Sequence, residues 1–455
     1  LLRDVLLDEK LVIAVECLES CHQPLLDAYL AGKMKESKFL ESVDWTKHWG
    51  FPWENYRPLF ELARERDYPM IALNKYYRTR TVSALAKRDR HAAGVLATTR
   101  KLHPRHLIFV LYGDLHLAES HLYGAIREEK AFAKEKILRI FLNSERLYFR
   151  QARKGLVKPQ GILRSSGDRY CLLTAPPWAK WQSYLMFLEQ TYDRELGESG
   201  GIDYTDHLAA LIRLAGEDLG IKFKVHDIAV YSSEDRSFYL KSVRHLPRNF
   251  EKIVKRLVSS DRSFYIPRGG IFYLSRPSVN HAASLAGQYI QAKLSGRRRP
   301  AWNMPSDFLG AIWIEAASFF VSKLINPHRK SESLHLIRQE LEAGDPCGRG
   351  RATLLVVLDQ RMSEIIQIHS ERKRPRRYRP PAHFHYIEAA RILGSMMGER
   401  FFTGYKRGRF SKAQVLKLIS QDVFASDFGS SYFQLVKQME SSDPEFINTT
   451  VVGKS

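Results

Sequence analysis

Short apolar segments, each followed by a polar residue, recur through the first part of the chain. They are 11–15, 69–73, 106–111 and 137–142, and the polar residues that follow them are Glu16, Asn74, Asp114 with His116, and Asn143 with Glu145. Continuous aliphatic and β-branched runs of this length are typical of strands that are covered on both faces. A fifth strand is predicted over 170–174.

Helical patterns separate these strands. We expect helices over 53–66, where apolar residues share one face, over the long basic segment 79–101, and over 117–134. Strands that alternate with helices at this spacing indicate crossover connections in a parallel sheet. The predicted fold class is therefore α/β, a parallel sheet with flanking helices, followed by a mostly α-helical C-terminal domain.

The pattern changes after about residue 200. A helix over 203–219 is predicted to precede short strands at 228–231, 237–240 and 270–274. Further helices are expected over 279–294, 307–324, 331–343, 353–370 and 385–397. Alanine and glycine on one side of 279–294 indicate close packing against a neighbouring helix.

The changes in pattern predict three domains. These are an α/β domain over 1–185, an α+β connecting region over 186–277 and a mainly helical basic domain over 278–455. The chain has 455 residues, 44% of them hydrophobic and 27% charged, which indicates folded domains and excludes a disordered chain. The most apolar stretch, within 308–325, carries Glu315 and is predicted to be a buried helix and not a membrane span.

The ends and the cysteines say little about the compartment. The chain begins at Leu1 in a helix-like stretch, so we expect the natural protein to begin further upstream, and a signal sequence or lipoprotein anchor there stays open. Four cysteines slightly favour the cytoplasm. Cys17, Cys21 and His22 lie close together in sequence, so a zinc site there stays an alternative to ordinary packing, although no second pair has a matching spacing.

The net charge of +21 predicts attraction to an anion. Two basic segments, 297–299 and 372–379, are candidate contacts for nucleic acid or an anionic membrane surface. The alternative is that both are solvated loops. A small anionic ligand such as a haem propionate would also suit the charge.

Candidate chemistry lies at the predicted strand ends, because ligands of parallel sheets bind beyond the carboxyl ends of the strands. Gly113 would let the chain turn, Asp114 would cap the following helix, and His116 would point into the crevice as a metal ligand, general base or haem ligand. Glu16 could orient that imidazole, bind the same metal or activate water. The alternative is that His116 packs and Asp114 only caps.

An ordered set of motifs over roughly residues 8–130 resembles the ChaN-like family. Val15-Glu16 with the segment 23–32, Trp45 and Trp49 with the segment 56–64, the segment Ile71-Ala72-Leu73-Asn74, and Gly113-Asp114-Leu115-His116 match that family's pattern in order. The family associates with haem and iron and shares a fold with the erythromycin-esterase and TraB/Tiki groups. The family's first motif, Gly-Glu-x-His, belongs on a strand before Leu1, and this sequence does not contain it. Whether that motif precedes Leu1 in the natural protein stays open, and the metal or catalytic role depends on it.

The resemblance implies a haem- or iron-binding protein with its ligand at the C-terminal edge of the sheet. The implied haem contacts are Tyr56, Asn74, Tyr112, Asp114 and His116, and Glu16 with His116 would be the metal ligands. One alternative is an esterase-like or metal-dependent hydrolase, in which Glu16 and His116 are catalytic and a divalent metal can take part. Another is a non-enzymatic protein that binds nucleic acid or an anionic surface.

Overall fold

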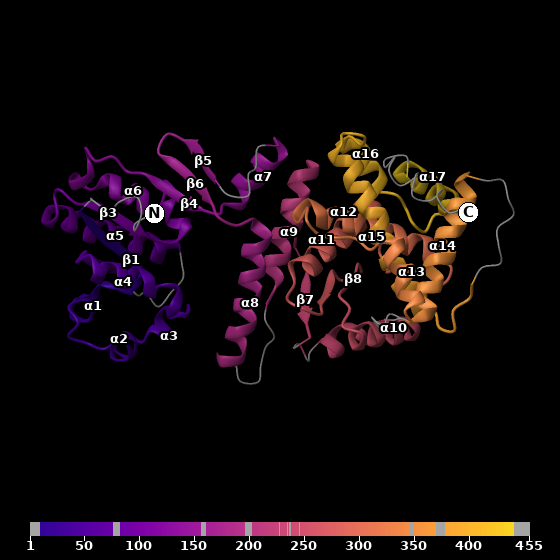
Figure 1. Ribbon diagram of the computed structural model, residues 1–455, viewed down its shortest axis with the longest axis horizontal. Helices are drawn as coiled ribbons and strands as arrows, with labels where there is room; N and C mark the ends of the chain where they lie inside the picture. Colours follow the sequence, from indigo (N-terminus) through magenta and orange to yellow (C-terminus); the bar gives the residue numbers. More distant parts are fainter. Residues whose placement is uncertain are drawn as a thin grey trace. The chain divides into compact units, whose positions relative to one another are not determined.

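The structure is a computed structural model that divides into two compact units, residues 1–177 and 178–455 (Figure 1). It describes residues 10–75, 82–155, 161–195, 203–226, 228–233, 235, 238–244, 246–344, 350–369 and 378–440. It confirms a mixed α/β chain with a parallel sheet and a helical C-terminal region. The erythromycin-esterase/ChaN-like topology and the three-domain division stay predictions.

A parallel sheet of three strands forms the centre of the first unit. Its strands are β1 (Leu11–Glu19), β2 (Met70–Asn74) and β3 (Leu107–Leu111), in the order β2-β1-β3. Val15 of β1 lies beside Ala72 of β2 and Leu111 of β3. β1 is the middle strand, and this position explains its nearly continuous apolar sequence.

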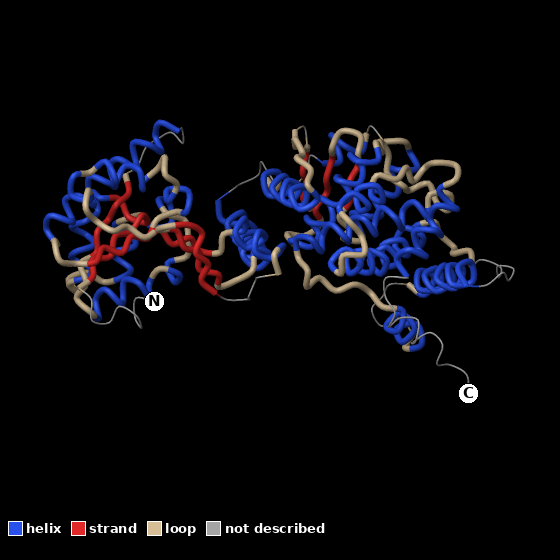
Figure 2. The backbone as a smooth tube through the Cα atoms, turned by 90° about the horizontal axis from the view of Figure 1, so that it is seen from above, coloured by secondary structure: helices blue, strands red, loops and turns tan. Residues whose placement is uncertain are grey.

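Helices cover both faces of this sheet (Figure 2). Ile13 and Val15 point to an aromatic core beneath the first helices, whereas Ala14 points to the other face. The first helices are α1 (Gln23–Leu30), α2 (Glu36–Ser42), α3 (Trp45–His48) and α4 (Arg57–Glu65); α5 (Val82–Leu102) and α6 (Leu122–Glu128) cover the other face. Short 3₁₀ turns are η1 (Ser20–His22), η2 (Trp53–Asn55), η3 (Asp114–Leu117) and η4 (Lys130–Phe132).

The fourth predicted strand does not extend this sheet, and that prediction is wrong. β4 (Arg139–Leu142) pairs in parallel with β6 (Arg169–Leu173), which also pairs with β5 (Gly161–Ser166), so a second sheet forms in the order β4-β6-β5. The outward residues Ile140 and Leu142 are 41% and 53% exposed. The apolar run therefore belongs to a strand covered on one face, which sequence alone does not separate from a buried strand.

The helix predicted over 117–134 is also wrong, because this segment is divided into η3, α6 and η4. Short helix α7 (Glu145–Arg153) follows β4. Asn143 accepts hydrogen bonds from the backbone of Thr174 and Ala175, so it closes the second sheet.

The second unit begins with α8 (Pro177–Glu195) and α9 (Thr205–Leu219). A small sheet follows in the order β7-β9-β8, made of β7 (Ala229–Ser232), β8 (Phe264–Ile266) and β9 (Ile271–Leu274). The strand predicted at 237–240 is wrong over its described part, where a π-helical turn, Tyr239–Val243, follows buried Phe238, which packs against Tyr231 and Phe264. Helix α10 (Arg248–Ser259) precedes β8.

The helical part of the second unit packs around α12. Its helices are α11 (Val279–Ser295), α12 (Phe308–Ile325), α13 (Leu334–Glu342), α14 (Arg351–His369), α15 (Phe384–Lys406), α16 (Lys412–Ile419) and α17 (Phe428–Glu440). By length and composition α12 could cross a membrane, but 89% of it is buried in this unit. It is therefore placed as the core helix that the sequence predicted. α15 runs further than expected, to Lys406.

Close helix contacts confirm the small-residue prediction for 279–294. A Cβ on Gly287 would lie 2.6 Å from Cα of Ser318 on α12, and one on Gly394 of α15 would lie 2.4 Å from Cβ of Glu315. Ser318 also donates a hydrogen bond of 2.7 Å to the carbonyl of Ser284. These contacts hold α11 and α15 against the two sides of α12.

Candidate functional site

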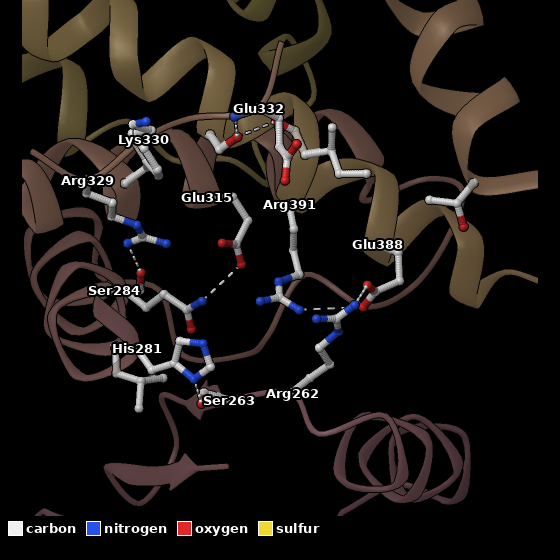
Figure 3. A pocket seen from close by; sticks show the side chains of 16 residues that line it. Arg262, Ser263, His281, Ser284, Glu315, Arg329, Lys330, Glu332, Glu388 and Arg391 are labelled. Carbon is white, nitrogen blue, oxygen red and sulfur yellow. Dashed lines mark hydrogen bonds and ion pairs between the residues drawn. The ribbon is translucent and has the colours of Figure 1, made fainter. Parts of the chain in front are cut away.

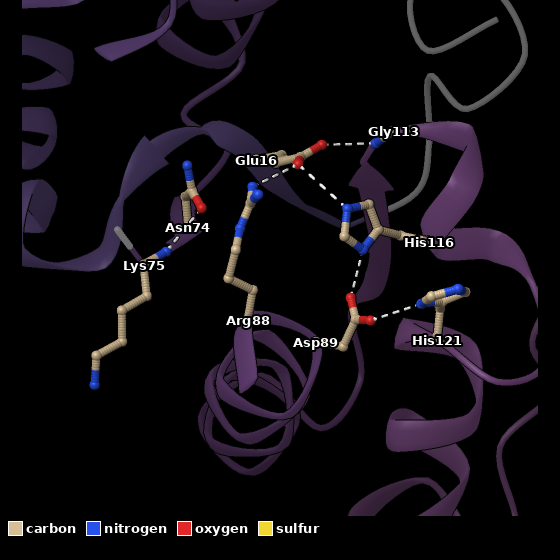
Figure 4. A network of polar contacts seen from close by, with 8 residues as sticks. All are labelled: Glu16, Asn74, Lys75, Arg88, Asp89, Gly113, His116 and His121. Atoms are coloured by element: carbon tan, nitrogen blue, oxygen red, sulfur yellow. Dashed lines mark hydrogen bonds and ion pairs between the residues drawn. The ribbon is translucent and has the colours of Figure 1, made fainter. Parts of the chain in front are cut away.

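Glu16 of β1 and His116 of η3, the turn that follows β3, lie side by side (Figure 4). Oε1 of Glu16 is 3.7 Å from Nε2 of His116, and Oε2 of Glu16 accepts a 2.7 Å hydrogen bond from the backbone N–H of Gly113. A Cβ on Gly113 would lie 3.3 Å from that carboxylate, so glycine permits this close approach. The parallel pairing of β1 with β3, which ends at Val15 and Leu111, brings both side chains to one sheet edge.

Asp89 of α5 fixes the imidazole from its other side. Its carboxylate is hydrogen-bonded to Nδ1 of His116, 27 residues away, and its second oxygen lies 3.2 Å from Nδ1 of His121. Asp89, His116 and Glu16 are 2%, 5% and 8% exposed. Because a carboxylate accepts hydrogen bonds, it favours the proton on Nδ1 of His116 and leaves the lone pair on Nε2 facing Glu16.

Arg88, the neighbour of Asp89, balances part of the negative charge. Its Nη2 lies 3.0 Å from Oε1 of Glu16. Asp89 and Glu16 supply two carboxylates against the one guanidinium of Arg88, an excess of acidic groups that favours a cation at this place.

The sequence prediction did not include Arg88, Asp89 or His121. One signal was available, because Asp89 is the single acidic residue in the basic segment 79–101 and buried acids are normally paired. His121 follows His116 closely in sequence, but its approach to Asp89 depends on the break between η3 and α6.

Of the two tyrosines predicted as haem contacts, Tyr112 lies beside His116 and Tyr56 lies in the aromatic core. The ring of Tyr112 packs edge-on against His116 with centroids 4.6 Å apart, and its buried hydroxyl has no hydrogen-bond partner among the described residues. Burial raises the pKa of Tyr112. Tyr56 packs with Trp45 and Trp49 in the aromatic core, where burial raises its pKa.

Three predicted strand-end residues have other roles. Asn74 accepts a 2.8 Å hydrogen bond from the backbone of Lys75. Asp114 is exposed at the start of η3, and α6 begins only at Leu122, so the predicted helix cap is wrong. Asn143 belongs to the second sheet, and the expectation of four strand ends at one crevice is therefore wrong.

The side chains around His116 are better placed to bind a single iron ion than to bind a haem. Among the described residues, no three His, Cys, Asp or Glu side chains come together to hold a metal ion. Nε2 of His116 and Oε1 of Glu16 could face one cation, with other ligands supplied from outside this pair. A haem approaching Nε2 would have to displace Glu16 and Arg88, because both occupy that side of the ring.

A cavity of about 750 Å³ in the first unit lies elsewhere, along β2 and α5. It is lined by Met70 and Ala72 on the strand and by Val95 and Thr99 on the helix, and neither Glu16 nor His116 reaches it. The network around His116 is a buried polar cluster at the sheet edge, since Asp89, His116 and Glu16 are at most 8% exposed.

The first basic segment is not a free cationic surface. Arg297 is buried and donates a 2.8 Å hydrogen bond to Gln291, and burial lowers its pKa to about 10. Arg299 pairs with Asp307 at 2.6 and 3.0 Å. The predicted contact of 297–299 with nucleic acid or membrane is therefore unsupported, since the guanidiniums of Arg297 and Arg299 are engaged by Gln291 and Asp307 of the same unit.

Arg298 is the exposed residue of that segment. In the second basic segment, residues 372–377 lie outside the described residues.

One comparison with known proteins gave a match. Residues 1–80 match a family model described as haem-binding uptake, Tiki superfamily, ChaN, which agrees with the resemblance seen in the motifs. The match includes Glu16 and Asn74 and ends before Asp89 and His116. This N-terminal segment is therefore similar to a haem-binding uptake family. Searches of curated proteins and of solved structures found no match.

Proposed function

We propose that the first unit binds haem or iron, with His116 as the iron ligand. The observation that carries the proposal is the buried imidazole fixed through Nδ1 by Asp89, with Nε2 directed at Glu16. A histidine whose second nitrogen is held by a carboxylate is a common arrangement at metal sites, because the carboxylate orients the ring and raises its basicity. The family match over residues 1–80 supports haem as the form of the iron.

Each neighbour of His116 has a separate part in this proposal. Asp89 holds the ring and its tautomer, Glu16 is the second donor for an iron ion, and Tyr112 forms an aromatic wall. Arg88 is the nearest cation for a propionate. When bound, haem would supply an iron centre that His116 would ligate and whose chemistry these neighbours would tune.

The predicted contacts Tyr56, Asn74 and Asp114 enter the proposal less directly. Asn74 and Asp114 are at strand ends of the same sheet edge and could contact the rim of a haem. Tyr56 is part of the aromatic core and would have to leave its contacts with Trp45 and Trp49 to reach the iron. We therefore place His116 ahead of Tyr56 as the ligand.

Haemin titration of the full chain tests the proposal. We expect a saturable shift of the Soret band at one haemin per chain in the wild type and its loss in His116→Ala. His335→Ala changes an exposed histidine of the second unit and is the matched control. A parallel titration with ferrous iron alone separates an iron site from a haem site.

Two results would remove the proposal. One is that neither haemin nor ferrous iron binds the full chain. The other is that His116→Ala and the control variant bind both probes as the wild type does.

The geometry also favours a second candidate, an esterase-like hydrolase. An imidazole between Asp89 and Glu16 resembles a general base with an orienting acid, in which Nε2 would accept the proton of an attacking water. The assay is a panel of ester and amide substrates with and without divalent metal. Activity that disappears in both His116→Ala and Asp89→Asn would favour this candidate, and inactivity towards the whole panel would remove it.

A further inference from the structure

The second unit contains a polar cavity of about 440 Å³ between helices (Figure 3). Its walls are regular helix faces: His281, Ser284, Leu285 and Gln288 follow one face of α11, and Glu388, Arg391, Ile392 and Ser395 follow one face of α15. Glu315 and Phe319 of α12 form the third wall. Facing helices of a bundle are a common place for a ligand site, and this volume suits a small organic molecule.

Cations outnumber anions around this cavity. Arg262, Arg329, Lys330 and Arg391 line it, against Glu315, Glu332 and Glu388. Burial raises the pKa of Glu315, which favours its neutral form. The cavity therefore has an excess of positive charge in a partly desolvated place, where charges are weakly screened.

Arg391 lacks a full partner for its charge. Its Nη1 is buried with no hydrogen bond and lies 3.7 Å from Oε1 of Glu388, which also has no hydrogen bond among the described residues. The other oxygen of Glu388 is already engaged by Arg262 at 2.7 Å. One carboxylate is thus shared by two guanidiniums, and Arg391 retains an unsatisfied donor at the cavity (Figure 3).

Arg329 lies on the other side of Glu315 and has neutral partners. It donates to the hydroxyls of Ser284 and Ser322, the latter at 2.7 Å, and stacks over the ring of Phe319. Burial lowers the pKa of Arg329 to about 10. Burial and the nearby arginines lower the pKa of His281 to about 4, so this imidazole is neutral at pH 7 and can accept or donate a hydrogen bond.

From this arrangement we propose that the cavity of the second unit binds a small organic oxyanion, a carboxylate or a phosphate ester, through Arg391. The oxyanion would complete the hydrogen bonding of the Arg391 guanidinium, which suits planar oxyanions. Gln288 and Glu315, which are hydrogen-bonded to each other at 2.9 Å, would form hydrogen bonds with a hydroxyl or amide group on the same molecule. Leu285 and Ile392 would contact its carbon skeleton. This site is separate from the His116 network and does not depend on the proposed function.

Calorimetric titration of the full chain with two probes tests the site and separates its two sources. The probes are glutarate for carboxylates and glycerol 3-phosphate for phosphate esters. We expect at least one of them to bind saturably at one molecule per chain. Arg391→Gln should weaken that binding by about tenfold or more, because a charge-assisted hydrogen bond is lost.

Two further variants keep the test independent of folding. Glu388→Gln releases Arg391 from its shared carboxylate and should tighten binding, a change that a damaged fold does not produce. Arg338→Gln changes an exposed arginine on α13 and should leave binding unchanged. The proposal is overturned if neither probe binds saturably, or if Arg391→Gln and Glu388→Gln both bind as the wild type does.

Discussion

Oε1 of Glu16 lies 3.7 Å from Nε2 of His116, although Glu16 is in β1 and His116 is in η3, the turn that follows β3. On the opposite side of the ring, Nδ1 of His116 is held by Asp89. An imidazole between two buried carboxylates is costly to maintain without a compensating role or partner. We consider this relationship the centre of the first unit's chemistry.

Asp89→Asn should weaken binding of haemin or ferrous iron by about 10- to 100-fold, because an amide orients the imidazole less firmly than a carboxylate does. The measurement is the same titration used for His116→Ala. Asp44→Asn is the control, since Asp44 is exposed and lies outside the proposed site. Equal affinities of Asp89→Asn and wild type would mean that the Asp89 contact is only structural.

Glu16→Gln should destabilise the chain by about 2 kcal/mol, since it leaves a guanidinium without its carboxylate. The cost is below that of a fully buried pair, because the side chain of Arg88 is 28% exposed. Urea unfolding measures it. Glu41→Gln, which breaks an exposed pair with Lys38, should cost about 0.5 kcal/mol or less. A loss for Glu16→Gln no larger than for this control would contradict the ion pair.

Tyr112→Phe shows whether Tyr112 ligates the iron or only packs against His116 as an aromatic wall of the site. The buried hydroxyl of Tyr112 has no hydrogen-bond partner among the described residues, so its removal should stabilise the unbound chain by about 1 kcal/mol. Haemin affinity should change little, because the ring remains against His116. Loss of the Soret shift in this variant would transfer the ligand role from His116 to Tyr112.

The sequence could predict part of this site, for a clear physical reason. A strand pattern that ends in an acid or a histidine predicts which residues share a sheet edge, and this placed Glu16 beside His116. It does not tell where a helix crosses the sheet, so Asp89 and Arg88 of α5 were not found. The run 137–142 has the same composition in a strand covered on one face as in a buried one, which is why β4 was assigned to the wrong sheet.

The second unit was predictable at the level of its helices and less so at its cavity. Apolar spacing placed α11, α12 and α14 within a few residues of their observed bounds. The polar lining of the cavity comes from one face each of α11 and α15, and only the packing of both against α12 brings these faces together.

Gly287→Ala should destabilise the second unit by about 2 kcal/mol, because its Cβ would meet backbone that has no room to move. The nearest atom is Cα of Ser318 at 2.6 Å. Gly429→Ala, on α17, has no heavy atom within 4 Å and should be neutral or stabilising by up to about 1 kcal/mol. Thermal unfolding compares them, and equal stabilities would contradict the close contact between α11 and α12.

The stability of the second unit should fall as the pH drops from about 6.5 towards 4. Burial lowers the pKa of His207 from 6.5 to about 4, so in this window the unfolded chain binds the extra proton and folding loses up to about 3 kcal/mol. Above about pH 6.5, His207 is neutral in both the folded and the unfolded chain, and its full contribution to the free energy of unfolding is present. His207→Gln should reduce the dependence measured by urea unfolding but not abolish it, because His281 in the same unit has a pKa lowered to about 4 as well. The exposed control His335→Gln should leave the dependence unchanged. An unchanged slope in His207→Gln would contradict the buried neutral imidazole.

The position of the iron relative to His116 decides whether this histidine is the iron ligand. Crystals of the full chain grown with haemin, measured at the iron absorption edge, would show it as an anomalous peak. We predict one peak beside Nε2 of His116, with Asp89 still bonded to Nδ1. A peak at another residue, with His116 still enclosed by Glu16 and Asp89, would contradict it.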